Sequence, residues 1–520
     1  MIRSSTALFA AALCWSAAAA AAEGPVVTTQ SGQVQGKLAE GVEAFLGIPY
    51  AASPAGQGRW QPPQPPAAWS GVRPAQSYGP ACPQLNGIDS PRTEDEDCLA
   101  VNVQRPPNTA AGAKLPVLVY IYGGGFTGGT GNNEDMDALV RTNGIVAVTM
   151  NYRLGALGFL AHPAVADAKG QSGNYGFMDQ QAALRWVRDN IAAFGGDPAR
   201  VTIGGESAGG RSVLAHLVAP GSRGLFNRAI VMSGSDATPP LREAEAAGTS
   251  FAQSLGCDGP GAADCLRSKP VGALIDAKDP PHLLTGGTDV LPQGPVAALQ
   301  GGASTVPVLI GGQRDEYRAL MTEWPTRSVP EYSREQYLRY VRDQFKDRAE
   351  AVLAVYPWPS DPTRYTGTYL VTKLRTDSMN TGSVGACSTQ KITDALVARG
   401  APVWRYEFDH AEGPGWFSIP GYVWGAGHAA ELAYIIPHRH NLANNGGALN
   451  RDEQQLSDQM LRAWGGFVRD GDPANEGTGP WPRFEANGAV LSLQAGGRSA
   501  VVPVAAINAA HNCTFWDAMR

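Results

Sequence analysis

The chain has 520 residues, 43% of them hydrophobic, and its formal net charge at pH 7 is −6. This length and composition are typical of a globular protein with a large buried core. The mildly acidic balance argues against nucleic acid and anionic membrane surfaces as partners. The acidic excess is too small to indicate a cationic substrate.

The N-terminus has the pattern of a secretory signal peptide. Arg3 precedes an alanine-rich apolar stretch at 7–22, and residues 20–22 are alanines of the kind that a signal peptidase requires. We expect 1–22 to be removed, leaving Glu23 first and changing the formal charge from −6 to −7, because one basic and no acidic residue is lost. No later apolar run is long enough to span a membrane. The pattern predicts a secreted or periplasmic protein without a membrane anchor.

The cysteine count indicates disulfides. Of the seven cysteines, Cys14 lies in the expected signal peptide. The others are Cys82, Cys98, Cys257, Cys265, Cys387 and Cys513. An even number in an exported chain favours disulfides, although spacing alone does not select the pairing. The first two are close in sequence, as are the next two, which leaves the last two as a third pair. No Cys-x-x-Cys pair or cysteine–histidine cluster indicates a metal site, so we expect none.

Strand-length apolar runs alternate with helical patterns along the chain. In chain order we expect strands at 117–121 and 145–150, a helix at 180–190, a strand at 201–203, a helix at 210–218, and strands at 306–310 and 403–408. This order predicts an α/β fold with a large mixed, mostly parallel sheet and helices on both faces. No repeat or long linker divides residues 23–520, so we expect one catalytic domain there.

The sequence Gly-Glu-Ser-Ala-Gly at 205–209 lies between an expected strand and an expected helix. A serine between two glycines at such a turn is the nucleophile-elbow pattern. The glycines permit a turn too tight for larger residues. Ser207 would then lie at the N-terminus of a helix, whose dipole favours negative charge. This arrangement indicates a serine that attacks a carbonyl.

A serine nucleophile needs a base, and the base needs an acid to orient it. His428 is one of eight histidines and lies among small residues at 425–431, in a loop suited to bring an imidazole to the elbow. From composition alone, a surface histidine is an equally good interpretation. The acid is expected between serine and histidine in the chain. Asp315 and Glu316 both follow the expected strand at 306–310, and the residues alone do not distinguish them.

A glycine run after the strand at 117–121 indicates an oxyanion-binding loop. Gly123, Gly124 and Gly125 let backbone N–H groups turn toward a ligand without obstruction by side chains. With the N–H of Ala208, they would form a pocket of donors for a developing oxyanion. A flexible turn or a phosphate-binding loop is the alternative. The lysine and hydroxyl residue that a Walker loop requires are absent.

Taken in order, these motifs resemble the type-B carboxylesterases of the α/β-hydrolase fold, the group that includes carboxylesterases, cholinesterases and related lipases. The resemblance covers almost the whole of residues 23–520. The segments that carry it are Phe-Leu-Gly-Ile-Pro-Tyr-Ala at 45–51, Glu-Asp-Cys-Leu at 96–99, the glycine loop at 122–126, Asn-Tyr-Arg-Leu-Gly at 151–155, 173–180, 190–198 with its Phe-Gly-Gly-Asp-Pro, 205–209, Ser-Gly-Ser at 233–235, Arg-Asp-Glu at 314–316 and 425–432. Each segment alone is weak evidence for the family, but the occurrence of all of them in this order is specific to it.

The resemblance implies roles for particular residues. It places the catalytic triad on Ser207, His428 and Glu316, because the second residue of the family's Asp-Glu segment is the acid. Ser233 matches a buried serine near that triad. We expect Ser233 and Glu206 to support the triad through contacts behind the reacting groups.

The resemblance also places the oxyanion donors on Gly124, Gly125 and Ala208. It implies the disulfides Cys82–Cys98 and Cys257–Cys265, and a third bridge found in some members, Cys387–Cys513.

The implied activity is that of a serine carboxylesterase, which hydrolyses small-molecule carboxylic esters through an acyl-enzyme without cofactor or metal. The same triad serves lipases, thioesterases, amidases and specialised xenobiotic or natural-product esterases. An inactive adhesion-type homologue is disfavoured because the triad residues are present. The loop at 82–98 lacks the tryptophan that binds choline in cholinesterases, which disfavours choline esters. Arg211, one turn after Ser207, suits an acidic acyl group or, more simply, a structural ion pair.

Overall fold

The structure is a computed structural model. It describes residues 24–87, 90–302, 306–323, 326–378, 384–413, 415–437, 448–485 and 488–519. The expected signal peptide at 1–22 lies outside the described residues.

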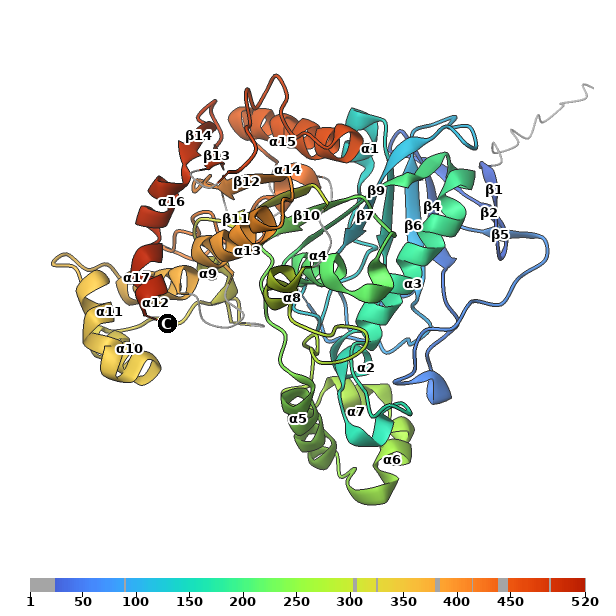
Figure 1. Cartoon of the computed structure of the whole chain (residues 1–520), viewed down its shortest axis with the longest axis horizontal. Coiled ribbons are helices and arrows are strands. Elements are labelled where there is room, and N and C mark those ends of the chain that lie inside the picture. The colour runs from blue at the N-terminus through green and yellow to red at the C-terminus, as the bar shows by residue number, and fades with distance from the viewer. Residues whose placement is uncertain are drawn as a thin grey trace, which may run out of the picture.

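An 11-stranded sheet runs through the centre of the molecule (Figure 1). In sheet order its strands are β14 (Ala500–Pro503), β13 (Ala489–Leu493), β12 (Val403–Phe408), β11 (Val308–Gln313), β10 (Arg228–Met232), β9 (Gly196–Glu206), β7 (Leu115–Ile121), β8 (Val146–Met150), β6 (Ala100–Arg105), β4 (Val42–Pro49) and β3 (Lys37–Ala39). Neighbours from β13 to β8 pair in parallel, and the strands at both edges pair antiparallel. The sheet is therefore mixed and mostly parallel, as the sequence predicts. A separate small sheet contains β1 (Val26–Thr29), β2 (Gly32–Gln35) and β5 (Val72–Pro74).

Helices cover both faces of the large sheet and extend beyond it. They are α1 (Asp137–Asn143), α2 (Gly155–Phe159), α3 (Tyr175–Asn190), α4 (Ala208–Val218), α5 (Leu241–Ser254), α6 (Ala262–Ser268), α7 (Val271–Ile275), α8 (Pro295–Gly301), α9 (Tyr317–Leu320), α10 (Arg334–Phe345), α11 (Ala349–Val355), α12 (Thr366–Asp377), α13 (Ala386–Ala398), α14 (Leu432–Ile435), α15 (Arg451–Asp470), α16 (Val504–Ala510) and α17 (Cys513–Ala518). In Figure 1, α5, α6 and α7 lie at the lower end of the molecule, and α10 and α11 lie at the left.

The strand β7 at the centre of the sheet is apolar because both of its faces are buried. In β7, Val119 and Ile121 pack into the cluster that contains side chains of α3, α4 and α13. Leu118 and Tyr120 point to the opposite face and pack with α1, α14 and α15. Burial of one such aliphatic side chain stabilises the fold by about 1.5–3 kcal/mol. The continuous apolar runs in the sequence thus become strands covered on both sides.

Two elements differ in extent from their predictions. The strand expected at 306–310 begins at Val308 and continues to Gln313. Pro307 has no N–H to donate to a ladder, although its carbonyl still accepts from Ala229 N at 3.0 Å. The helix expected at 180–190 begins at Tyr175, because the buried side chains of Tyr175 and Phe177 extend its apolar face by another turn. The other expected elements lie within β7, β8, β9, α4 and β12, apart from Ile145, which directly precedes β8.

Three disulfides are present among the residues that the structure describes, and they join the pairs that the resemblance implies. They are Cys82–Cys98, Cys257–Cys265 and Cys387–Cys513, with Cα–Cα distances of 5.0, 5.5 and 5.3 Å. Such bonds are consistent with an extracytoplasmic location. Within the described ranges, no helix has the length and apolar character needed to cross a bilayer.

Candidate active site

The turn between β9 and α4 holds Ser207 in a conformation that residues with side chains rarely adopt, with φ 57° and ψ −119°. The turn is tight because α4 begins at once against the end of β7. A Cβ atom on Gly209 would lie 1.9 Å from the carbonyl oxygen of Ile121, and one on Gly205 would lie 2.6 Å from the carbonyl carbon of Gly209. Glycine at both positions is therefore a steric requirement, and the serine is left half-buried at the end of the sheet.

Three side chains from distant parts of the chain meet at this turn. His428 Nε2 lies 2.8 Å from Ser207 Oγ, and His428 Nδ1 lies 2.5 Å from Glu316 Oε2. Ser207 directly precedes α4, Glu316 follows β11, and His428 precedes α14. Both the imidazole and the carboxylate are buried. The arrangement can move a proton from the hydroxyl to the imidazole while the carboxylate orients the ring.

The carboxylate of Glu316 is itself fixed by two further donors. Its Oε1 accepts hydrogen bonds from Ser233 Oγ at 2.7 Å and from Gln313 N at 2.9 Å. Ser233 follows β10, and its N–H donates to the carbonyl of Gly311 at 2.9 Å. With Oε1 occupied in this way, Oε2 is left to face the imidazole. Ser233 thus contacts the carboxylate of Glu316 directly.

Two other buried glutamates lie close to the imidazole. Glu206 Oε1 is 3.2 Å from His428 Nε2, so this carboxylate lies on the opposite side of the ring from Glu316. Glu431 is fully buried, and burial together with the charges of Glu206 and Glu316 raises its pKa well above the usual range. Its Oε1 accepts from the Tyr406 hydroxyl at 3.4 Å.

Glu431 was not predicted from the sequence to have a role in the site. Its position three residues after His428, within one motif, is the signal that would have drawn attention to it.

The carboxylates change the proton affinity of the imidazole. Burial alone would lower the pKa of His428, but the charges of Glu206 and Glu316 and the hydrogen bond to Glu316 outweigh burial. Together they raise the pKa to about 9. The site therefore favours the imidazolium, which is the form that results when a histidine accepts the proton of a serine nucleophile.

The glycine loop after β7 lies against the elbow. A Cβ atom on Gly123 would lie only 3.1 Å from the Cβ of Ser207. Gly124 and Gly125 have φ values of 101° and 63°, in the region that favours glycine. Ala208 is the first residue of α4, so its N–H belongs to the group of amides that lack a partner within a helix. The structure thus places the loop and the helix start, where oxyanion donors are expected, next to Ser207.

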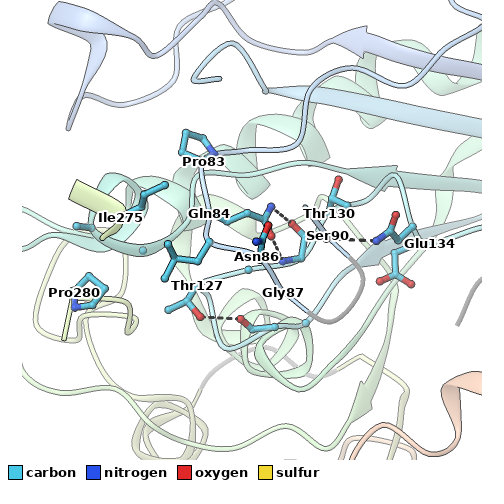
Figure 2. Close-up of a pocket in the computed structure, with 18 of the residues that line it drawn as sticks. Pro83, Gln84, Asn86, Gly87, Ser90, Thr127, Thr130, Glu134, Ile275 and Pro280 are labelled. Atoms are coloured by element: carbon cyan, nitrogen blue, oxygen red, sulfur yellow. Dashed lines mark hydrogen bonds between the residues drawn. The ribbon is translucent and has the colours of Figure 1, made fainter. Parts of the chain in front are cut away.

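A cavity of about 460 Å³ borders Gly123, Gly124 and Glu206 (Figure 2). Figure 2 shows Ile275 and Pro280 on one side of it and Glu134 on the opposite side. Other apolar side chains in its wall are Leu85, Leu274 and Leu432. Among the described residues that line the cavity, Glu134 and Glu206 are acidic and none is Lys or Arg. The space suits an apolar group that carries no negative charge.

Arg211 is partly buried on α4, one turn after Ser207. Burial lowers the pKa of its guanidinium, and the nearby phenol of Tyr317 opposes that effect. Tyr317 directly follows Glu316, so Arg211 lies on the side of the site that carries the acid.

Comparison with known proteins agrees with this geometry. The sequence model of the Carboxylesterase family matches residues 23–516. The chain belongs to the carboxylesterase family. This carboxylesterase is 36% identical over 492 residues to fumonisin B1 esterase of Sphingopyxis macrogoltabida, covering 89% of this chain and 85% of that relative. It is also 36% identical over 483 residues to para-nitrobenzyl esterase of Bacillus subtilis (strain 168), covering 88% and 92% of the two chains.

Solved structures show the same fold. The crystal structure of the Geobacillus stearothermophilus carboxylesterase EST55 superposes with a TM-score of 0.78 at 34% identity, covering 93% of this chain and 99% of that chain. The carboxylesterase therefore has the α/β-hydrolase fold that the sequence predicts. It is a carboxylic-ester hydrolase of the type-B group.

Proposed function

We propose that Ser207, His428 and Glu316 are the nucleophile, base and acid of this carboxylesterase. The observation that carries the proposal is the continuous series of contacts from Ser207 Oγ to His428 Nε2, at 2.8 Å, and from His428 Nδ1 to Glu316 Oε2, at 2.5 Å. Residues separated by more than a hundred positions make these contacts in the order that the chemistry requires.

In the proposed reaction, Ser207 Oγ attacks the ester carbonyl carbon as His428 Nε2 takes the hydroxyl proton. The N–H groups of Gly124, Gly125 and Ala208 stabilise the oxyanion that forms. The tetrahedral intermediate then expels the alcohol, which takes the proton from Nε2. A water molecule attacks the acyl-enzyme with the same imidazole as base, and the carboxylic acid leaves as Ser207 recovers its proton.

The two carboxylates on either side of the ring have separate roles in this proposal. Glu316 holds the imidazole with Nε2 toward Ser207, and Ser233 holds Glu316. Glu206, next to Nε2, stabilises the imidazolium that exists between the two proton transfers. Both contacts are electrostatically strong because the groups are buried.

The proposed substrate is a small carboxylic ester whose acyl or alcohol group occupies the cavity beside Gly124 and Glu206. That cavity is lined by Gly124, one of the proposed oxyanion donors, and by Glu206, the residue that directly precedes the proposed nucleophile. Fumonisin B1 esterase and para-nitrobenzyl esterase are both named for ester hydrolysis.

We also propose that residues 1–22 direct export and that 23–520 form one catalytic domain, secreted or periplasmic. The alanine-rich N-terminus and the three disulfides support this location.

Replacement of the nucleophile tests the mechanism. Ser207→Ala should lower kcat for p-nitrophenyl acetate by more than about a thousandfold and abolish covalent labelling by a fluorophosphonate probe. Ser212→Ala replaces a buried serine in α4, the helix that Ser207 directly precedes, and is the matched control, which should remain active and labelled. If folded Ser207→Ala loses less than tenfold in kcat, Ser207 is not the nucleophile.

A further inference from the structure

The loops that carry the proposed acid and base are joined through their backbones at two consecutive residues. Asp315 N donates to the carbonyl of Ala426 at 2.8 Å, and Ala426 N donates in return to Asp315 Oδ2 at 3.1 Å. One residue further on, His428 N donates to the carbonyl of Glu316 at 3.1 Å. The only side chain in these three contacts is that of Asp315, which catalysis as described above does not use.

Two guanidinium groups hold the Asp315 carboxylate in place. Its Oδ2 accepts from Arg314 Nη2 at 2.7 Å and from Arg314 Nε at 3.0 Å. Its Oδ1 pairs with Arg318 Nη2 at 3.3 Å, and Arg318 Nη1 also donates to the carbonyl of Val423 at 3.3 Å. Arg318 therefore contacts both the carboxylate and the segment that leads to the histidine. Charge-assisted contacts of this kind restrict a carboxylate more than neutral hydrogen bonds do.

The histidine loop approaches this carboxylate too closely for any side chain to intervene. Gly425 has φ 62°, and a Cβ atom there would lie 2.4 Å from Asp315 Oδ2 and 2.8 Å from Arg318 Nη1. A glycine is needed for both reasons. The position of residues 425–428 is thus set by direct contact with Asp315 and its arginines.

We propose that Asp315 is a positioning residue that sets the place of the His428 ring by holding the N–H of Ala426, with Arg314 and Arg318 keeping its carboxylate fixed. The inference rests on the proposed triad. We call the contact between the Asp315 carboxylate and Ala426 N the latch. A displacement of a reacting group by about 1 Å can lower a rate by about 100-fold. The latch can therefore affect kcat through the position of the ring, without contact between Asp315 and the substrate. Asp315 does not line the cavity that is proposed to hold the ester.

A graded pair of variants tests the latch. Asp315→Asn keeps an oxygen that can accept from Ala426 N but weakens the pairing with both arginines, whereas Asp315→Ala removes all of these contacts. We expect kcat to fall by about tenfold in Asp315→Asn and by about 100-fold in Asp315→Ala, with KM for p-nitrophenyl acetate changed by less than about twofold. A purely structural role would instead lower the fraction of active protein and leave kcat per labelled site unchanged.

Asp409→Asn is the matched control. Asp409 also pairs with Arg314, through Nη1, but it has no contact with residues 425–428 among the hydrogen bonds of the described chain. Its kcat should stay within about twofold of the wild type. A loss in Asp409→Asn equal to that in Asp315→Ala would overturn the latch in favour of a general effect of charge around Arg314.

A spectroscopic readout separates this inference from the proposed function. The proton between His428 Nδ1 and Glu316 Oε2 should give a far-downfield ¹H NMR signal, since the bond is short and charge-assisted. The signal should move upfield in Asp315→Ala and remain in place in Asp409→Asn. If folded Asp315→Ala has an unmoved signal and the kcat of the wild type, the proposed latch is wrong. If Asp315→Ala does not fold, an unmoved signal and wild-type kcat in Asp315→Asn show the same. Failure of the triad itself would appear in Ser207→Ala, and the NMR signal does not depend on turnover.

Discussion

At the scale of single residues, the protonation of His428 depends on two carboxylates that face different ring nitrogens. Glu316 faces Nδ1 at 2.5 Å, and Glu206 faces Nε2 at 3.2 Å. Each favours the charged ring, and together they outweigh burial and raise the pKa to about 9. In the free enzyme the neutral ring is the one that can accept the proton of Ser207. Activity limited by this group should therefore rise with pH.

Removal of one carboxylate should shift this pH dependence. In the wild type we expect kcat/KM to rise with pH and to have its midpoint above 6.5, toward 9. Glu206→Gln removes a negative charge that favours the imidazolium, so its midpoint should move down toward 6.5. Profiles measured between pH 5 and 10 with a neutral ester provide the check. Glu331→Gln, which breaks an exposed ion pair with Arg364, is the control and should leave the midpoint in place. An unchanged or higher midpoint in Glu206→Gln would contradict this account.

At the scale of elements, the site depends on how closely α4 packs on the ends of β7 and β10. Added Cβ atoms would lie 1.9 Å from the carbonyl oxygen of Ile121 at Gly209, and 2.5 Å from that of Met232 at Gly210. These contacts hold the first turn of the helix directly against two strands. The position of Ser207 and of the Ala208 N–H follows from that contact.

A single methyl group should therefore separate the helix from the sheet. Gly209→Ala forces α4 away from β7, because the atom it would meet belongs to backbone and cannot rotate away. We expect kcat to fall by about 100-fold and the free energy of unfolding to fall by about 1–3 kcal/mol, the usual cost of overpacking. Urea unfolding and ester hydrolysis measure the two effects. Gly261→Ala, where a Cβ atom meets nothing within 4 Å, should change neither. Wild-type activity in Gly209→Ala would show that the packing is not restrictive.

At the scale of the whole molecule, a buried histidine ties the C-terminal segment to the catalytic core. His511 Nδ1 lies 2.6 Å from Asp377 Oδ1 at the end of α12, and Nε2 lies 3.1 Å from Glu407 Oε1 in β12. Burial would lower the pKa of His511, but the hydrogen bonds to these two carboxylates outweigh it and raise the pKa to about 9. The disulfide Cys387–Cys513 lies beside this group and joins α13 to the same C-terminal segment.

This histidine should make stability depend on pH in the alkaline range. The folded pKa is above the unfolded value of about 6.5, so its contribution of about 3 kcal/mol is fully present below pH 6.5 and is lost as pH rises through about 9. Urea unfolding at pH 6, 8 and 9.5 measures the loss. His428 has a raised pKa in the same window, so His511→Asn should reduce the slope by about half without abolishing it. An unaltered slope in His511→Asn would exclude the charged network as the cause.

Local patterns in the sequence were sufficient to predict much of the fold. The strand at 117–121 and most of the strand at 145–150 lie within β7 and β8, because an apolar run rich in β-branched residues has few alternatives to a doubly buried strand. The elbow at Ser207 was equally predictable from the sequence, since its glycines are required by contacts within a few ångströms of the turn. Such features depend on residues adjacent in the chain, so they can be predicted without tertiary contacts.

Other features required the tertiary structure. Asp315 and Glu316 are chemically similar neighbours, which the residues alone did not distinguish, although the resemblance implies Glu316 as the acid. In the structure the Glu316 carboxylate faces His428, whereas that of Asp315 faces the backbone of Ala426. Glu206 was expected behind the reacting groups, yet it lies beside the Nε2 that faces Ser207. The direction of a side chain in a turn depends on which distant segment packs against it.

The sequence by itself determined the doubly covered sheet, the strained serine turn and the glycine loop, because local sterics and hydrophobic periodicity act within each segment. Only the tertiary structure decided on which side of the imidazole Glu206 lies, how the loops at 314–318 and 423–428 are joined, and that the cavity combines an apolar wall with two carboxylates. Those features depend on distances between segments more than a hundred residues apart, and packing of the whole sheet sets these distances.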